Sequence, residues 1–158
     1  MTRILVASVG RNRATALRRA TEEYEDRLRR YIRFEAVVVA PARLPDARAP
    51  EAREREAAAL ERRLPDELEF IALTREGERW TTRALADYLD DMRTYGRPGA
   101  AFAIGGAHGL APRLLDRARA RLALSAMTLP HEVARLVLTE QLYRAATILR
   151  GEPYHKGP

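Results

Sequence analysis

The chain has 158 residues, a length that predicts one domain over residues 1–158 with enough material to bury a hydrophobic core. Its formal net charge is +6, and Lys156 is the only lysine, so arginine supplies nearly all of the positive charge. Such a basic chain favours a polyanionic partner, most often nucleic acid. The sequence holds no cysteine, which excludes disulfides and thiolate metal sites. No apolar stretch reaches about 18 residues and no signal-peptide pattern opens the chain, so we expect no membrane association and a cytoplasmic location.

The first half of the chain alternates strand-like and helix-like patterns. Residues 4–9 form an apolar run rich in branched side chains, which is typical of a buried strand. Residues 14–32 predict a long helix, because one face collects Leu17, Ala20, Tyr24, Leu28 and Tyr31. Residues 34–40 predict a second strand. Three prolines then mark a loop before a charged helix over residues 51–63.

The second half continues this alternation. In chain order we first expect a strand over residues 68–73, a turn over 74–80 and a helix from Thr81 or Thr82 to about Tyr95. A strand over 100–104 and a short helix from Pro112 follow. The chain then continues with a short extended segment within 122–129 and a final helix from Pro130 to about Leu149. Strands separated by helices imply parallel crossovers. The pattern therefore predicts an α/β fold with a mostly parallel sheet and helices on both faces.

The final helix is apolar over more than one stripe. Its wide apolar surface is formed by Val133, Leu136, Val137, Leu138 and Leu142. A helix of this kind needs cover on two sides. A second subunit is the simplest source of that cover, and a larger internal core is the alternative.

A glycine-rich loop follows the strand at residues 100–104. The segment 101–110 reads AFAIGGAHGL. A phosphate loop of the Walker type would need a lysine and a Ser or Thr after its glycines, and here Leu110, Ala111 and Pro112 follow instead. A dinucleotide fingerprint would need three glycines after the first strand, where only Gly10 stands. The loop is therefore either a plain strand-to-helix turn or the border of a cofactor site without a phosphate.

Four segments taken together carry a family resemblance. They are IGGAHGL (104–110), LSAMTLPH (124–131), EQLYRA (140–145) and GEPYHK (151–156). In this order and spacing, the chain resembles the ribosomal RNA large subunit methyltransferase H family, which belongs to the SPOUT class. The resemblance implies a SPOUT-type fold with a C-terminal trefoil knot. It also implies a homodimer that transfers the methyl group of S-adenosylmethionine to N3 of a pseudouridine in the 23S ribosomal RNA of the assembled 70S ribosome.

The resemblance also implies where S-adenosylmethionine would bind. The cofactor-binding positions carried over are Leu73, Gly105, Leu124, Ser125, Ala126, Met127, Thr128 and Leu129. The chemistry of these positions suits a cofactor without phosphate, since leucine and methionine side chains can sandwich an adenine whose edge is read by backbone groups. Gly105 would let the backbone approach the ligand closely. Each of the leucines is equally explained as a core residue.

On the substrate side, the candidate catalytic residues are Arg135, His131, Tyr154 and His155. The N3 proton must leave during methylation, so an acceptor is needed, and Glu140 is a further candidate for it. Arginine can hold phosphate and tyrosine can stack on a flipped nucleotide. Structural roles remain open for several of them, because Glu140 and Arg144 stand four residues apart and can simply pair with each other. We expect no metal site.

Two alternatives stay open at this stage. One is a basic RNA- or ribosome-binding dimer whose cofactor site is idle, and the other is a purely structural dimer. The basic residues of the first long helix are Arg18, Arg19, Arg27, Arg29 and Arg30. These arginines either line an RNA surface or belong to a mixed-charge face, because glutamates and an aspartate stand among them.

Overall fold

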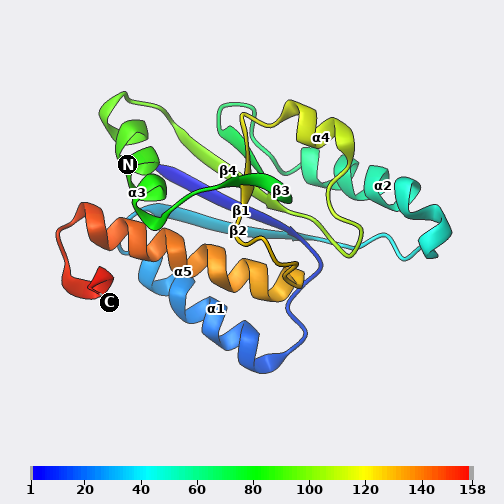
Figure 1. The fold of residues 1–158 in the computed structure, drawn as a ribbon, viewed down its shortest axis with the longest axis horizontal. Coiled ribbons are helices and arrows are strands. Elements are labelled where there is room, and N and C mark those ends of the chain that lie inside the picture. The colour runs from blue at the N-terminus through cyan, green and yellow to red at the C-terminus, as the bar shows by residue number, and fades with distance from the viewer. Residues whose placement is uncertain (1, 157–158) are drawn as a thin grey trace.

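A computed structural model describes residues 2–156 and shows five strands in one parallel sheet. The order across the sheet is β2-β1-β4-β3-β5, and every pair of neighbours is parallel (Figure 1). The α/β class and the mostly parallel sheet are thereby confirmed. The strands are β1 (Arg3–Val9), β2 (Arg33–Val39), β3 (Glu69–Arg79), β4 (Gly99–Ile104) and β5 (Ala120–Ala123).

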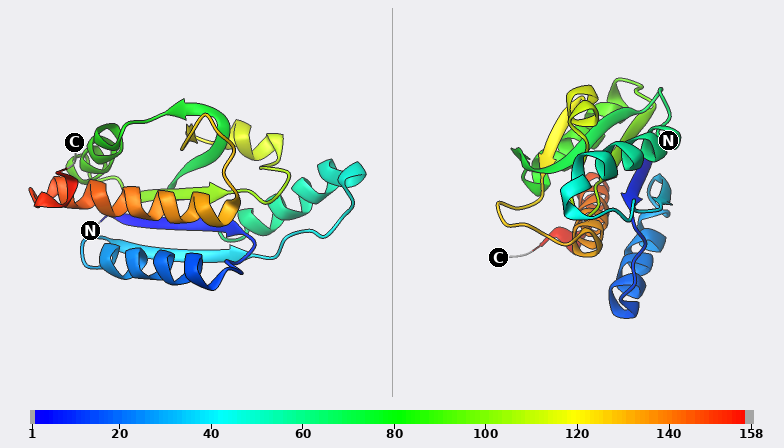
Figure 2. Two further views of the ribbon diagram at one scale, coloured as in Figure 1. Left: turned by 60° about the horizontal axis from the view of Figure 1, so that its bottom comes forward. Right: turned by 90° about the vertical axis from the view of Figure 1, so that its right-hand side faces the viewer.

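Helices cover both faces of the sheet, as the alternation of the sequence predicts (Figure 2). One layer holds α1 (Thr15–Leu28), α3 (Thr82–Thr94) and α5 (His131–Leu149), and the other holds α2 (Ala49–Glu61) and α4 (Pro112–Arg117). Two short 3-10 helices complete the chain, at Asp46–Arg48 and Pro153–His155.

Strand β1, second from one edge of the sheet, packs side chains into both halves of the core. Successive side chains of a strand point to opposite faces. Accordingly, Ile4 and Val6 pack in the α1–α3–α5 layer, and Leu5, Ala7 and Val9 pack in the α2–α4 layer. All of these residues are buried, so β1 is covered on both faces, and its carboxyl end leads into the loop that begins at Gly10.

The predicted turn over residues 74–80 is wrong, because β3 continues to Arg79. Two parts of β3 pair with β5, one ending at Leu73 and one beginning at Glu78, and the register shifts between them. Gly77 permits the second pairing, since a Cβ there would lie 2.7 Å from the backbone of Arg121. Pairing with β5 also begins earlier than predicted, so Ala120–Ala123 is extended and residues 124–130 form a loop.

The last helix, α5, packs against α1 and α3 and is apolar on more sides than they cover. Leu138 and Leu142 are fully buried, whereas Val133, Leu136 and Val137 are only half-buried. None of the helices between residues 2 and 156 combines the length and apolar character needed to cross a membrane. The trefoil knot implied by the family resemblance stays a prediction.

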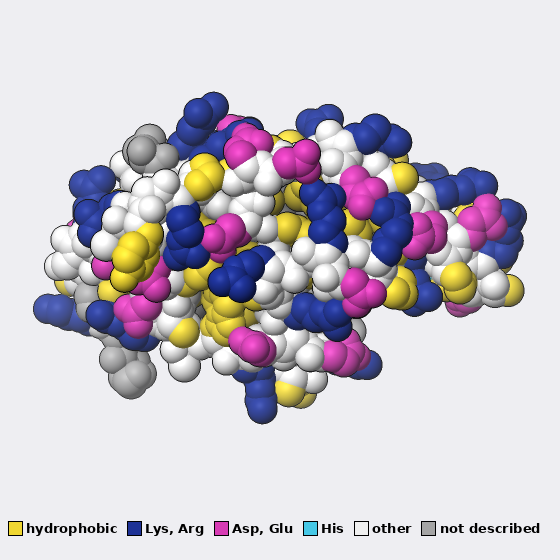
Figure 3. Space-filling model, turned by 90° about the horizontal axis from the view of Figure 1, so that it is seen from above, with side chains coloured by type: hydrophobic (Ala, Val, Ile, Leu, Met, Phe, Trp, Pro, Cys, Tyr) yellow, Lys and Arg dark blue, Asp and Glu magenta, His cyan; other side chains and the backbone are white. Residues whose placement is uncertain are grey.

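The surface charge is mixed. Figure 3 shows arginine and acidic side chains interleaved over one face of the molecule, without a continuous basic patch there. On α1, Arg27 pairs with Glu23, and Arg29 lies 2.6 Å from Asp26. The interpretation of the first helix as a mixed-charge face is therefore confirmed for these two arginines.

Candidate functional site

A large cavity lies where β4 ends and α5 begins, beside the middle of β3. Its volume is about 700 Å³, within the range of sites that enclose a small organic cofactor. Three stretches of chain line it, namely residues 73–76, residues 104–110, and a third stretch that includes Leu122 and most of residues 124–131. In open parallel α/β sheets, ligands bind at the carboxyl ends of the strands, and this cavity has that position.

The glycine loop after β4 folds back on itself. Gly106 and Gly109 form an isolated bridge, with the amide of Gly109 donating to the carbonyl of Gly106 at 3.1 Å. Gly109 has a φ of +76°, which favours glycine. A Cβ on Gly105 would lie 2.6 Å from the carbonyl carbon of Gly109. Gly105 therefore borders the cavity, but the nearest reason for its missing side chain is the loop's own backbone.

A buried carboxyl group, that of Glu56, packs against this loop. Glu56 of α2 accepts a hydrogen bond from the amide of Ala42 at 3.1 Å, and a Cβ on Gly106 would lie 3.2 Å from its Oε2. Burial raises the pKa of Glu56. The second glycine of the loop thus lets the chain lie directly on Glu56 and on Val9 at the end of β1.

The loop over residues 124–129 forms the wall opposite the glycines. Ser125 accepts a hydrogen bond from the amide of Met127 at 2.9 Å, which turns the chain. Met127 is 77% exposed although it borders the cavity, and Leu124 and Leu129 also pack on the core. Of the eight positions expected for the cofactor, seven line the cavity and Ala126 does not: Leu73, Gly105, Leu124, Ser125, Met127, Thr128 and Leu129.

A third wall, which the sequence pattern did not single out, follows Leu73. Thr74, Arg75 and Glu76 line the cavity, and Arg75 donates to the hydroxyl of Thr128 at 3.0 Å. The hydroxyl of Thr74 donates to Glu76 at 2.8 Å, which lowers the pKa of that carboxyl group. Glu76 also pairs with Arg75 at 3.3 Å, so this wall carries one negative and one positive charge. The only signal in the sequence is that these residues directly follow Leu73.

Among the substrate-side candidates whose side chains the structure describes, only His131 lines the cavity. Its Nε2 atom is buried and has no hydrogen-bond partner in the part of the chain that the structure describes. A Cβ on Gly10 would lie 3.2 Å from that nitrogen, so the glycine at the end of β1 makes room for the ring. Arg135 follows one helical turn later, pairs with Glu25 at 2.8 Å, and lines a separate cleft.

Tyr154 lies in a cluster with side chains of α1 and α5 rather than at the cavity. Its hydroxyl donates to Glu140 at 3.1 Å, and its ring centroid lies 4.7 Å from that of Tyr143. Glu140 also accepts from Arg144 at 2.9 Å, as the spacing of four residues predicts. Burial is the main cause that raises the pKa of Tyr154. The side chain of His155 lies outside the described part of the structure. One chain therefore does not bring Tyr154 to His131.

Between residues 2 and 156, no group of three or more His, Cys, Asp or Glu side chains is arranged to hold a metal ion. The ionisable side chains at the cavity, among the described residues, are Arg75, Glu76, His108 and His131. His108 lies 3.6 Å from Asp46 and is part of the glycine loop.

Comparison with known proteins gives a consistent family. The model of the family described as "Predicted SPOUT methyltransferase" matches residues 2–155. The chain is 50% identical over 154 residues to a protein of Anaeromyxobacter sp. (strain Fw109-5) named Ribosomal RNA large subunit methyltransferase H, covering 98% of this chain and 99% of the relative. Proteins of the same name from Gemmatimonas aurantiaca and Bacillus cytotoxicus are 43% and 38% identical, covering 98% and 97% of this chain and 99% of each relative. The chain belongs to the SPOUT methyltransferase family.

Proposed function

We propose that this protein transfers the methyl group of S-adenosylmethionine to N3 of a pseudouridine in the large-subunit ribosomal RNA, with the assembled 70S ribosome as substrate and the cytoplasm as its location. The observation that carries the proposal is the cavity, in which Leu73, Gly105 and the loop over residues 124–129 meet although they are far apart in the sequence. The relatives named above support the choice of ribosomal RNA as substrate.

The cavity suits S-adenosylmethionine in size and chemistry. Leu73, Leu124 and Leu129 supply apolar walls for an adenine, and the loops leave backbone groups near the cavity to read its edge. The carboxylate of Glu76, although paired with Arg75, lies at the cavity and offers a hydrogen-bond acceptor to the ammonium group of the cofactor. When bound, the cofactor supplies an electrophilic methyl group.

The protein's own task is mainly to hold the nucleotide in line with that methyl group. His131 is our candidate to receive the N3 proton. Among the candidates with described side chains it alone borders the cavity, and its Nε2 has no hydrogen-bond partner among the described residues. Glu140 is a weaker candidate for that proton, since Arg144 and Tyr154 already hold it.

We propose that the active form is a homodimer. The half-buried side chains of α5, Val133, Leu136 and Val137, leave apolar surface that a second copy would cover. In one chain Tyr154 is held away from His131, so a dimer also offers a way for the C-terminal residues of one copy to reach the cavity of the other. Arg135, Tyr154 and His155 keep their proposed roles on the substrate side within such a dimer.

The decisive test compares the ribosomal RNA of the host before and after deletion of the gene. Nucleoside mass spectrometry should show N3-methylpseudouridine in the parent strain and its loss from the deletion strain, with return on complementation. Persistence of the modified nucleoside would reject the substrate. Calorimetry separates the alternative of an RNA-binding dimer with an idle site, because the proposed enzyme takes up S-adenosylmethionine and the idle dimer does not.

A further inference from the structure

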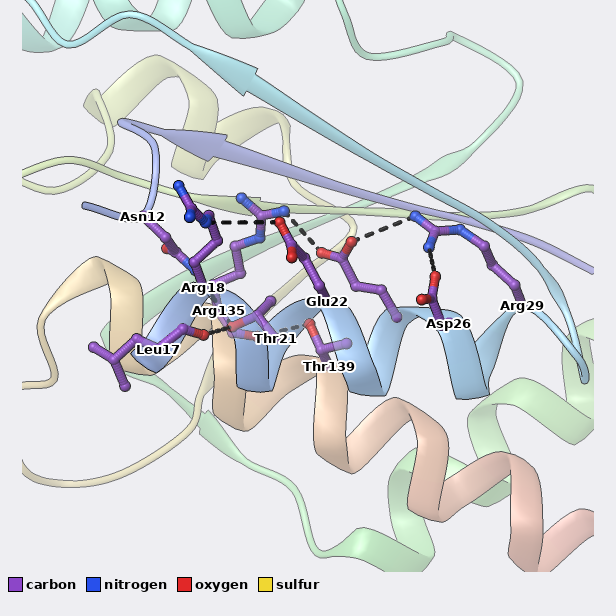
Figure 4. Close-up of polar contacts among 10 residues, drawn as sticks. Asn12, Leu17, Arg18, Thr21, Glu22, Asp26, Arg29, Arg135 and Thr139 are labelled. Carbon is purple, nitrogen blue, oxygen red and sulfur yellow. Dashed lines mark hydrogen bonds and ion pairs between the residues drawn. The ribbon is translucent and has the colours of Figure 1, made fainter. Parts of the chain in front are cut away.

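A second cleft lies beside the cofactor cavity, on the other side of the amino end of α5. Its volume is about 410 Å³, and it lies between the loop after β1, the first two turns of α1 and Arg135 of α5. Figure 4 shows the polar side chains of α1 and Arg135 gathered along this stretch. The cleft contains four arginines and one acidic residue, Glu22, so it has an excess of positive charge.

The base of the cleft carries two polar atoms without partners. Asn12 is only 7% exposed, and its Nδ2 donates to the hydroxyl of Thr21 at 3.3 Å. The hydroxyl of Thr21 in turn donates to the carbonyl of Leu17 at 2.8 Å, which fixes the orientation of the Asn12 amide. The Oδ1 of Asn12 and the Nε of Arg135 are then buried with no hydrogen-bond partner in the described chain. Buried polar atoms in native proteins are normally paired, so these two indicate a missing ligand.

The rim of the cleft carries arginines that are free to bind an anion. Arg18 has only a loose contact of 3.9 Å with Glu22. Arg11 and Arg13 are exposed, and within residues 2–156 neither has an acidic side chain in ion-pair range. By contrast, Arg27 near the end of α1 and Arg29 just after it are paired with acidic side chains.

The cleft is held rigidly against the cofactor cavity. Glu132, in the first turn of α5, accepts hydrogen bonds from the amides of Arg13 and Ala14, which ties the loop to the helix. Arg135 is fixed by its ion pair with the buried Glu25 at 2.8 Å. His131 borders the cofactor cavity, and Arg135 lies one helical turn away, about 6 Å along the axis.

We propose that this cleft binds a ribose–phosphate unit of the RNA strand next to the nucleotide that is methylated. The arginines of the rim bind the phosphate, and the Nε of Arg135 donates to one of its oxygens. The Oδ1 of Asn12 accepts a hydrogen bond from the ribose 2′-hydroxyl, a group that DNA lacks. The inference rests on the proposed function for its RNA substrate, but it concerns recognition of the backbone rather than methyl transfer.

The test is fluorescence anisotropy with a labelled single-stranded RNA and a DNA oligonucleotide of the same sequence, at several salt concentrations. The double variant Arg11→Ala/Arg13→Ala should weaken RNA binding and reduce the slope of log K against log salt by about 1.4, since each phosphate contact to a single strand contributes about 0.7. The matched control is Arg62→Ala/Arg63→Ala, which removes the same charge at exposed positions at the end of α2. The control should keep the slope of the parent protein.

A second variant tests the 2′-hydroxyl. Asn12→Ala should weaken RNA binding about fivefold, the effect of one hydrogen bond, and leave DNA binding unchanged. Equal slopes for the two double variants would overturn the phosphate assignment, and equal losses for RNA and DNA in Asn12→Ala would overturn the ribose assignment. Calorimetry on the same variants should show unchanged uptake of S-adenosylmethionine. Failure of methyl transfer in the parent protein, with these binding results intact, would count against the proposed function alone.

Discussion

Replacing Gly105 by alanine should weaken binding of S-adenosylmethionine at least tenfold. The new Cβ would lie 2.6 Å from the carbonyl carbon of Gly109 and 2.9 Å from the amide nitrogen of Leu110. These are backbone atoms, so they must retreat by about 0.8 Å to reach the 3.4 Å at which ordinary contact begins. Such a shift opens the 3.1 Å hydrogen bond between Gly109 and Gly106, at a cost of about 1 kcal/mol. The displaced loop also moves the cavity wall, which adds to the free-energy cost of binding. A total of about 1.4 kcal/mol corresponds to a tenfold loss of affinity.

The assay is isothermal titration calorimetry with S-adenosylmethionine, accompanied by thermal unfolding of each variant. The matched control is Gly96→Ala, since Gly96 has a φ of +64° but open space where its Cβ would stand, and it precedes the amino end of β4 whereas the cavity lies at the carboxyl end. That control should lose about 1–2 kcal/mol of stability from the left-handed backbone and bind the cofactor normally. If Gly105→Ala binds within twofold of the parent protein, the cavity is not the cofactor site or the loop adapts without cost, and the reasoning fails.

Two further predictions concern the folded state. Leu142→Ala should lower the free energy of unfolding by about 2–5 kcal/mol in a denaturant titration, because this side chain of α5 is fully buried. The control Leu149→Ala, at a position that is 36% exposed, should lower it much less. Tyr31 donates to Glu152 at 2.6 Å, and this hydrogen bond is the main cause that raises the pKa of Tyr31 to about 12. The raised pKa stabilises the fold below pH 10 and the benefit disappears as the pH rises toward 12, so the stability advantage over Tyr31→Phe should shrink across that interval; an advantage independent of pH would contradict the assignment.

The elements of the fold were predictable wherever one local pattern decided the structure. The strand at Ile4 follows from an unbroken run of branched apolar residues, and the helix ending at Leu149 follows from its length, its apolar content and the proline before it. Residues 74–80 were mispredicted because polar side chains around Gly77 are typical of a turn, while their extended conformation depends on pairing with β5, some forty residues later. Tertiary pairing of this kind leaves no local trace in the sequence.

The candidate site was predictable only in part. Family motifs pointed to Leu73, Gly105 and the loop over residues 124–129, and the structure gathers all of these but Ala126 at one cavity. Glu76 was not predictable because it belongs to no motif. Likewise, the ion pair between Arg135 and Glu25 joins residues that are 110 positions apart, and nothing in their local sequences links them.

The position of β1 in the sheet has a consequence for how the chain is made. Arg3 pairs with Arg33 of β2 on one side and with Gly99 of β4 on the other. During synthesis, one edge of β1 can therefore pair soon after β1 is made, whereas the other edge must wait for a strand about ninety residues later. During synthesis the inner edge of β1 stays open until β4 has left the ribosome. An open, apolar strand edge attracts other chains, and non-local pairing slows folding. The newly made protein therefore depends on rapid arrival of its middle third, and slow translation between β2 and β4 should favour aggregation.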